Sequence, residues 1–93
     1  MEFKANTVLI TGGASGIGFA LAERFIQAGS SVIICGRREN KLKEAQSKYP
    51  QLHICVCNVA NPAERTSLIT WVTETYPGLN MLVNNAGIQQ RIQ

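Results

Sequence analysis

With 93 residues, the chain is long enough for one domain, and its 45% hydrophobic and 16% charged residues suit a globular core rather than a disordered segment. Its net charge of +3 is mild, and the Lys and Arg residues are spread along the sequence, so no continuous basic face indicates a nucleic-acid partner. No apolar run near the N-terminus is long enough for a signal peptide or a membrane span, which favours a cytoplasmic protein without a membrane partner.

The sequence alternates strand and helix patterns without an obvious linker. In chain order, strands and helices are predicted in turn over residues 7–11, 16–28, 31–35, 39–48, 52–57, 61–76 and 81–84. Residues 32–35 are all apolar, as in a parallel sheet that is covered on both faces. The order predicts an α/β protein, a partial three-layer Rossmann fold over residues 1–93. Its parallel sheet has strand order 3-2-1-4, with ligands at the carboxyl ends of the strands.

Apolar spacing and caps define the predicted helices. The expected inner faces are Ile17, Leu21 and Phe25 in the first helix, and Leu68, Ile69, Val72 and Tyr76 in the third. Gly29 follows the first helix, where a glycine is favoured. Asn61 is a good N-cap for the third helix, Pro62 fits its first position, and Glu64 can complete a capping box.

A glycine-rich turn follows the first strand and precedes the first helix. In the pattern T-G-x-x-x-G-x-G, its residues are Gly12, Gly13, Ala14, Ser15, Gly16, Ile17 and Gly18. Glycine permits positive φ and close approach of a ligand to the backbone, and the free N–H groups of the next helix attract phosphate. No Gly-Lys-Ser/Thr follows, which argues against a P-loop, and a plain chain reversal needs fewer glycines. The turn therefore predicts a diphosphate site made by these residues.

Residues 84–87 read Asn-Asn-Ala-Gly directly after the fourth strand. With the glycine pattern, this motif resembles the short-chain dehydrogenase/reductase family of classical type, over essentially the whole chain. The resemblance implies a dinucleotide cofactor and assigns Asn85, Ala86 and Gly87 to its wall. It also implies that one asparagine ties neighbouring strands together through side-chain hydrogen bonds. Within the family, residues 32–37 and 83–89 most resemble the DltE-type reductases, which are encoded with lipoteichoic-acid D-alanylation genes.

The end of the second strand indicates which nicotinamide cofactor fits. An NAD site places a carboxylate there for the ribose 2′-hydroxyl, whereas this chain has Arg37 and Arg38. Two guanidinium groups suit a 2′-phosphate, so NADP is the predicted cofactor and NAD is the second choice. The alternative is that both arginines are solvated residues at the start of a helix. Glu39 comes one residue late and is expected in the first turn of that helix.

Asn58 and Val59, at the end of the third strand, are also assigned to the cofactor. The family often has Asp-Val at this place, and there the carboxylate meets the adenine amino group. This chain has Asn58 instead, whose side-chain carbonyl can accept the same hydrogen bond, although a neutral acceptor is weaker. The alternative is that Asn58 only terminates the strand.

The cysteines do not suit a closed disulfide framework, because there are three of them. Cys35, Cys55 and Cys57 all lie in predicted strands and are expected to be free and buried. His53 shares a strand face with Cys55 and Cys57, but a metal site usually needs a fourth ligand and turn-borne Cys-x-x-Cys spacing. A buried strand face is therefore favoured, and no metal is predicted.

The family carries its chemistry on a Ser and a Tyr-x-x-x-Lys motif beyond Asn-Asn-Ala-Gly. Here His53 stands four residues after Tyr49 and Asn80 stands four after Tyr76, so no catalytic residue is assigned. The expected protein is the cofactor-binding portion of a longer NADP-preferring oxidoreductase, truncated after the fourth strand and inactive alone. The whole protein would move hydride between the nicotinamide and a small-molecule carbonyl or alcohol substrate.

Two further expectations concern the chain as a unit. The open, apolar edge of the fourth strand predicts self-association, and hence a homo-oligomer. The alternative function is a non-catalytic, self-sufficient nucleotide-binding or interaction module. The Asn-Asn-Ala-Gly motif argues against a different Rossmann-type protein such as a methyltransferase.

Overall fold

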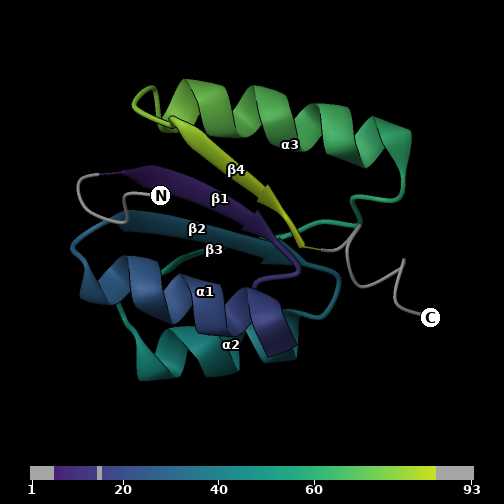
Figure 1. Ribbon diagram of the computed structural model, residues 1–93. Coiled ribbons are helices and arrows are strands. Elements are labelled where there is room, and N and C mark those ends of the chain that lie inside the picture. The colour runs from purple at the N-terminus through teal and green to yellow at the C-terminus, as the bar shows by residue number, and fades with distance from the viewer. Residues whose placement is uncertain (1–5, 15, 86–93) are drawn as a thin grey trace.

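The structure is a computed structural model that describes residues 6–14 and 16–85 of the chain (Figure 1). Four strands form one parallel sheet in the order β3-β2-β1-β4. Helices α1 and α2 cover one face of this sheet and α3 covers the other, so the chain is arranged in three layers (Figure 1). The predicted fold class, layering and strand order are therefore confirmed.

The observed elements lie close to the predicted ranges. They are β1 (Thr7–Thr11), α1 (Gly16–Gln27), β2 (Ser31–Gly36), α2 (Glu39–Lys48), β3 (His53–Val56), α3 (Pro62–Thr75) and β4 (Met81–Asn84). Strand β2 runs further than predicted, through Gly36, and β3 is shorter at both ends. The N–H of Cys57 still donates to the carbonyl oxygen of Gly36 at 2.8 Å, so the pairing between the β2 and β3 segments continues past the end of β3.

The apolar residues of the central strands alternate between two cores. Toward α1 and α2, the core contains Val8, Ile10, Val32 and Ile34 together with Ala22, Phe25, Leu42 and Ala45. Toward α3, it contains Leu9, Ile33 and Cys35 together with Cys57, Leu68 and Val72. Successive strand side chains point to opposite faces, and both faces are covered by helices. For this reason residues 32–35 are all buried, as predicted.

Helix α1 buries most of its predicted inner face, since Phe25 is buried and Leu21 is half-buried against the same core, but Ile17 does not belong to this face. Gly18, Ala22 and Phe25 are buried, whereas Ile17 is 53% exposed. A Cβ on Gly18 would lie 2.3 Å from the carbonyl oxygen of Gly12, so this glycine packs directly against the preceding turn. That contact sets the rotation of α1 about its axis and turns Ile17 outward.

Helix α3 packs on the sheet through Leu68 and Val72, as predicted, but Ile69 is 41% exposed and does not belong to the inner face. Tyr76 is half-buried and contacts the same core. Ile69 borders a cavity that it shares with Leu82 of β4, which is 56% exposed. Strand β4 is the edge of the described sheet, so no element of the described residues covers these two side chains.

The helix ends follow the predicted caps. Gly29 has a φ of 93°, the left-handed conformation expected just after the C-terminus of α1. At the start of α3, the Asn61 side chain accepts hydrogen bonds from the N–H groups of Ala63 (2.9 Å) and Glu64 (3.2 Å), and Pro62 is the first helical residue. The local signals in the sequence are thus sufficient to position both helix ends.

The three cysteines are free thiols, but not all of them are buried in strands. Cys35 and Cys57 are buried, Cys55 is half-buried, and Cys57 follows β3 instead of lying in it. Burial raises the pKa of the Cys35 thiol to about 12, and the neighbouring Cys57 and Cys55 add to this shift. Within the described ranges, no three His, Cys, Asp or Glu side chains are grouped as metal ligands would be. The helices described here are all too short or too polar to cross a membrane.

Candidate functional site

The predicted site residues follow the carboxyl ends of the strands, which meet at one edge of the sheet. All four strands are parallel, and Figure 1 shows their arrowheads at the same side of the molecule. The turn after β1, the start of α2 after β2, the loop after β3 and the chain after β4 therefore converge there. This edge is the place where a Rossmann sheet binds its ligand.

The turn after β1 requires glycine for two separate reasons. Gly12 and Gly16 have φ values of 65° and 59°, which side chains with a Cβ rarely adopt. At Gly13, a Cβ would lie 2.5 Å from Cγ2 of Ile34, so the turn lies directly on strand β2. The N–H of Gly12 donates to the carbonyl oxygen of Cys35 at 2.8 Å and fixes this approach.

Asn85 connects the chain after β4 to the same turn. Its Nδ2 donates to the carbonyl oxygen of Gly12 at 3.1 Å, and the side chain is completely buried. A Cβ on Gly18 would meet both partners of this bond, at 2.3 Å from the oxygen and 2.6 Å from Nδ2. The glycine at the start of α1 therefore leaves room for the asparagine to reach the turn.

Asn84 makes a second connection between neighbouring strands. The hydroxyl of Thr11 at the end of β1 lies 3.1 Å from Oδ1 of Asn84 and 3.3 Å from the carbonyl oxygen of Val83. The sequence predicted that one asparagine ties the strands together by side-chain hydrogen bonds. In the structure, Asn84 joins β4 to β1 in this way, whereas Asn85 joins the end of β4 to the turn after β1.

The other amide atom of Asn85 offers a hydrogen-bond acceptor at this site. Its Oδ1 is buried and accepts no hydrogen bond from the described residues. Leaving a buried acceptor without a partner costs about 1–3 kcal/mol. A ligand hydroxyl, such as a ribose provides, could supply the missing donor, and the glycine turn beside it has the open backbone that a diphosphate needs.

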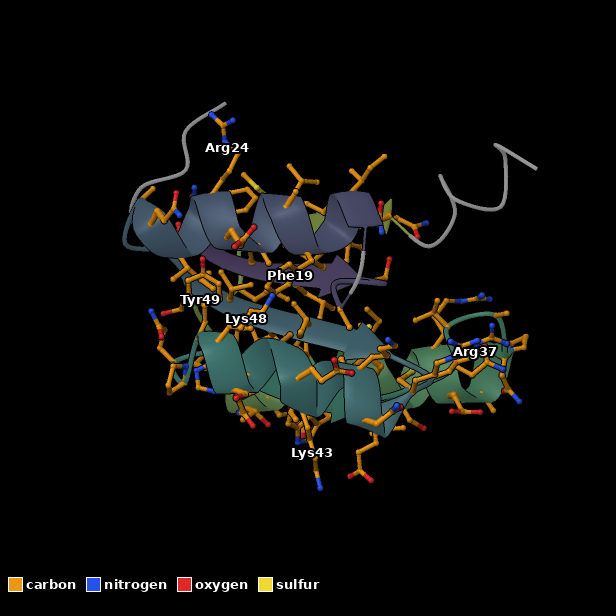
Figure 2. All side chains as sticks on the ribbon, turned by 90° about the horizontal axis from the view of Figure 1, so that it is seen from below. Phe19, Arg24, Arg37, Lys43, Lys48 and Tyr49 are labelled. Carbon is orange, nitrogen blue, oxygen red and sulfur yellow. The ribbon has the colours of Figure 1, made fainter. Side chains whose placement is uncertain are left out.

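Arg37 and Arg38 are exposed at the end of β2, and Figure 2 shows Arg37 beyond the tip of that strand. Arg38 is the N-cap residue of α2, with extended backbone angles. Glu39 lies in the first turn of α2, as predicted, and its carboxylate faces Lys43 at 3.9 Å. Both side chains of this pair are 64% exposed, so it is a surface ion pair of little energetic value.

The loop after β3 is held by two side chains from the first turn of α3. Oε1 of Glu64 accepts a hydrogen bond from the N–H of Asn58 at 3.0 Å, and Nη1 of Arg65 donates to the carbonyl oxygen of Val59 at 2.9 Å. The predicted capping box is wrong, because the N–H of Asn61 donates to the carbonyl oxygen of Asn58 and not to Glu64. The sequence did not identify Glu64 and Arg65 as the residues that hold this loop, although the spacing from Asn61 to Glu64 indicated a side-chain hydrogen bond near it.

The Asn58 side chain also has a local role. Its Oδ1 accepts a hydrogen bond from the N–H of Ala60 at 3.1 Å, which turns the chain away from the strand direction. This geometry supports the interpretation that Asn58 terminates β3, and it occupies the carbonyl oxygen that was expected to meet a base.

A cavity of about 510 Å³ opens on the α3 side of this edge. It is lined by Thr11, Val59 and Asn84 at the carboxyl ends of the strands, and by the apolar side chains of Ile69 and Leu82. Val59 is the predicted cofactor residue that lines it, whereas the described glycines and Arg37 and Arg38 do not. Ser15, Ala86 and Gly87, the remaining predicted residues of the turn and the wall, lie outside the described residues.

Comparisons with known proteins agree with this geometry. The family model described as short chain dehydrogenase matches residues 6–93. The "Uncharacterized oxidoreductase DltE" of Bacillus subtilis (strain 168) is 51% identical over 92 residues, which cover 99% of this chain and 36% of that protein. A 3alpha-hydroxysteroid dehydrogenase of Mediterraneibacter gnavus is 34% identical over 96 residues, covering 97% of this chain and 38% of that protein. The chain thus spans little more than a third of these two relatives.

Solved structures share the fold. A short chain dehydrogenase from Bacillus anthracis superposes with a TM-score of 0.78 and 32% identity, covering 89% of this chain and 35% of that one. A short-chain dehydrogenase from Streptomyces avermitilis gives a TM-score of 0.81 and 31% identity, with 88% and 31% covered. The resemblance carried by the glycine pattern and Asn-Asn-Ala-Gly is confirmed, including its similarity to the DltE type.

Proposed function

The chain belongs to the short-chain dehydrogenase family, and from that premise we propose that it is the cofactor-binding portion of an NADP-preferring oxidoreductase. The observation that carries the proposal is the glycine turn after β1. Two of its glycines have positive φ, and its backbone lies on β2. The buried Asn85 amide donates a hydrogen bond to its Gly12 carbonyl oxygen. A turn built in this way, followed by a helix N-terminus, is suited to hold a diphosphate.

Each predicted residue has a binding role in this proposal. Residues 12–18 hold the diphosphate, Arg37 and Arg38 bind the 2′-phosphate, and Asn58 and Val59 border the base. Asn85, Ala86 and Gly87 form the wall beside the ribose. The two exposed guanidinium groups at the end of β2 support a preference for a 2′-phosphate over a free 2′-hydroxyl.

The bound nicotinamide would give or accept a hydride, and the substrate would be a small-molecule carbonyl or alcohol. The names of the relatives, which include an oxidoreductase and a hydroxysteroid dehydrogenase, support this reaction class. Neither tyrosine of the chain has a lysine four residues later, so we assign its residues to binding and orientation and none to proton transfer. The 93 residues alone should therefore show no turnover.

Binding measurements with NADPH and NADH test the cofactor preference. Arg37→Ala combined with Arg38→Ala should weaken NADPH binding by about tenfold or more, because charge-assisted hydrogen bonds contribute about 1.5–3 kcal/mol each. NADH binding should change little. Lys41→Ala is the matched control, since it removes a positive charge from the same helix, and it should leave both dissociation constants nearly unchanged. Equal losses for the two cofactors would contradict the 2′-phosphate role.

Two broader properties belong to the same proposal. We propose a cytoplasmic location, and we propose that copies of the chain associate through the β4 edge. The exposed Leu82 on that strand and the neighbouring Ile69 support association, because apolar strand edges tend to pair. Light scattering across a concentration series tests it, and a monomer at all concentrations would contradict it.

A further inference from the structure

Strand β3 is the edge of the described sheet opposite β4, and none of the described residues pairs with its outer side. On its inner side, the N–H of Cys57 donates to the carbonyl oxygen of Gly36. Successive strand residues direct their backbone groups to alternate sides, so the N–H and C=O groups of Ile54 and Val56 point away from β2. Among the described residues, the only contact to these outward groups is from the Cys55 thiol, a weak donor, to the Val56 oxygen at 3.9 Å.

The side chains along this edge leave it open. Residues 53–56 read His-Ile-Cys-Val, without the lysine, acidic residue or proline that keeps many edge strands from pairing. Val56 is 52% exposed, and Trp71 of α3, which is 40% exposed, lies across a groove of about 350 Å³. Cys55 and Glu64 also line this groove between β3 and α3. An apolar edge beside an open groove is suited to take another strand.

We propose that β3 pairs with β3 of a second copy of the chain, antiparallel and about a two-fold axis that passes through Cys55. In this register the outward groups of Ile54 meet those of Val56 in the second copy, and symmetry repeats the pair. The side chain of Ile54 packs toward α1 and α2, and that of Val56 points to the same face. A branched aliphatic pair on neighbouring strands stabilises their association, so the exposed Val56 gains cover from the second copy.

Hydrogen bonds that the chain already makes argue against the two neighbouring registers. A pairing centred on Ile54 would place Val56 opposite Leu52, whose N–H donates to a carbonyl oxygen of its own chain at 2.9 Å. A pairing centred on Val56 would place Ile54 opposite Asn58, whose N–H donates to a side chain of α3 at 3.0 Å. Of these three registers, the one centred on Cys55 alone brings outward backbone groups against outward backbone groups.

The same register brings complementary polar groups together on the α3 side of β3. His53 contacts Tyr76 at the end of α3, with ring centroids 5.0 Å apart, whereas Glu64 lies in the first turn of α3 beside the other end of β3. Antiparallel pairing places His53 opposite Cys57 of the second copy, and therefore beside Glu64 in its groove. Oε1 of Glu64 accepts from the Asn58 N–H, and its other oxygen accepts from none of the described residues. An imidazole N–H of the second copy can donate to that oxygen, once at each end of the interface.

The two-fold axis predicts one specific covalent dimer. Cys55 faces its copy as a non-hydrogen-bonded pair, in which Cα atoms lie about 4.5 Å apart, within the reach of a disulfide. Diamide takes up the two protons and two electrons that two thiols lose, so it should link the copies through Cys55 on a non-reducing gel. Cys55→Ser should abolish this dimer, whereas Cys35→Ser and Cys57→Ser should retain it. No covalent dimer, or one that requires Cys35 or Cys57 instead, would overturn the pairing.

Sedimentation velocity distinguishes this surface from the β4 edge. Leu82→Lys places a charge on β4 and should leave a concentration-dependent dimer, because that residue lies at the opposite edge of the sheet. Adding Val56→Lys places a lysine beside Ile54 of the second copy at two symmetric positions, so the dissociation constant should rise by about tenfold or more. Both replaced side chains are more than half exposed, and circular dichroism checks that the fold is kept. A monomeric Leu82→Lys chain, or a dimer that Val56→Lys leaves unchanged, would refute the proposal.

Two substitutions at His53 test the contact with Glu64. Both remove the ring contact with Tyr76, so their comparison isolates the effect of charge. His53→Lys keeps a donor opposite the carboxylate and should leave the dimer at least as stable as in the unaltered chain. His53→Glu places two carboxylates together at each end of the interface and should weaken the dimer by about fivefold. Equal dissociation constants for the two variants would show that His53 does not meet Glu64, and the proposed register would be wrong.

Discussion

The turn after β1 and the loop after β3 lie at the same edge of the sheet but are held in opposite ways. The bond between Gly12 and Asn85 joins residues 73 apart in the sequence. The Asn58 N–H donates to Glu64, and Arg65 donates to the carbonyl oxygen of Val59; each of these bonds joins residues only 6 apart. The turn is therefore complete only when β4 has paired with β1, whereas the loop can form together with the first turn of α3.

The two regions also differ in what excludes other conformations. Around the turn, the constraint is steric: added Cβ atoms at Gly13 and Gly18 would lie 2.5 Å or less from their neighbours. Around the loop, it is a set of polar contacts on a largely exposed surface. Steric constraints in a packed region cost more to violate than surface hydrogen bonds. Substitutions should therefore affect the whole fold at the turn and only the local structure at the loop.

Gly18→Ala should give the largest effect, because it breaks the turn at its tightest contact. The new Cβ would lie 2.3 Å from the Gly12 oxygen and 2.6 Å from Asn85 Nδ2, and these two atoms are bonded to each other. Alanine has a better helix propensity than glycine, which stabilises the fold by about 1 kcal/mol, but the steric overlap of the added Cβ destabilises it by more than this. We expect the free energy of unfolding, measured by urea denaturation, to fall by about 2 kcal/mol.

Gly78→Ala is the matched control for that substitution. The nearest atom to its Cβ would be Oγ1 of Thr7, at 3.8 Å, which is an ordinary contact. The free energy of unfolding should change by less than about 0.5 kcal/mol. Similar losses for both variants would show that the contact at Gly18 is not what constrains the turn.

Asn85→Ala removes the long-range bond without adding any atoms. It leaves the carbonyl oxygen of Gly12 without its donor and opens a space in a completely buried position, but it also removes the unpartnered Oδ1, so we expect the free energy of unfolding to fall by about 1 kcal/mol. Asn84→Ala is the comparison, because Asn84 is exposed and its hydroxyl partner, Thr11, also contacts the carbonyl of Val83. Asn84→Ala should cost about half as much or less. An equal cost would mean that burial does not distinguish the two asparagines.

The sequence predicts most of this fold because its signals are local. The N-cap at Asn61, the glycine after α1 at Gly29 and the apolar run at 32–35 each act within a few residues. The rotation of a helix about its axis is not local. Ile17 and Ile69 both fit an apolar face by spacing, yet both are exposed, since the contact of Gly18 with Gly12 and the edge position of β4 decide which faces are covered.

The same distinction applies to the site. Glycines at fixed spacing predict the turn after β1, because few other residues can adopt its backbone conformation. Glu64 is different, since its spacing fits both a capping box with Asn61 and a hydrogen bond to Asn58. Asn58 and Asn61 are both close to Glu64 in sequence, and each has a backbone N–H that could donate to its carboxylate. Only the path of the loop decides between them, so the pattern alone could not identify Glu64 and Arg65 as the residues that hold it.

Glu64→Ala should give the smallest effect and the most local one. The lost bond from the Asn58 N–H is exposed, so the free energy of unfolding should fall by about 0.5–1 kcal/mol. Amide hydrogen exchange sharpens the comparison, because it reports each region separately. Exchange at Asn58 should accelerate by about fivefold, the kinetic equivalent of 1 kcal/mol, while the Gly12 amide, bonded to the Cys35 carbonyl, should change no more than the global stability does.

Two controls make the Glu64 experiment decisive. Glu64→Gln keeps an oxygen that can accept from the Asn58 N–H, so it should restore most of the protection at that amide. Glu44→Ala removes an exposed carboxylate whose pairing with Lys41, at 3.8 Å, is a surface ion pair of little energetic value, and it should leave both amides unchanged. If Glu64→Ala instead accelerates exchange at Gly12 and Asn58 to the same extent, the loop and the turn open together. The turn and the loop at the carboxyl ends of the strands would then be one cooperative unit. The contrast between a turn held by a long-range hydrogen bond and a loop held by local ones would be wrong.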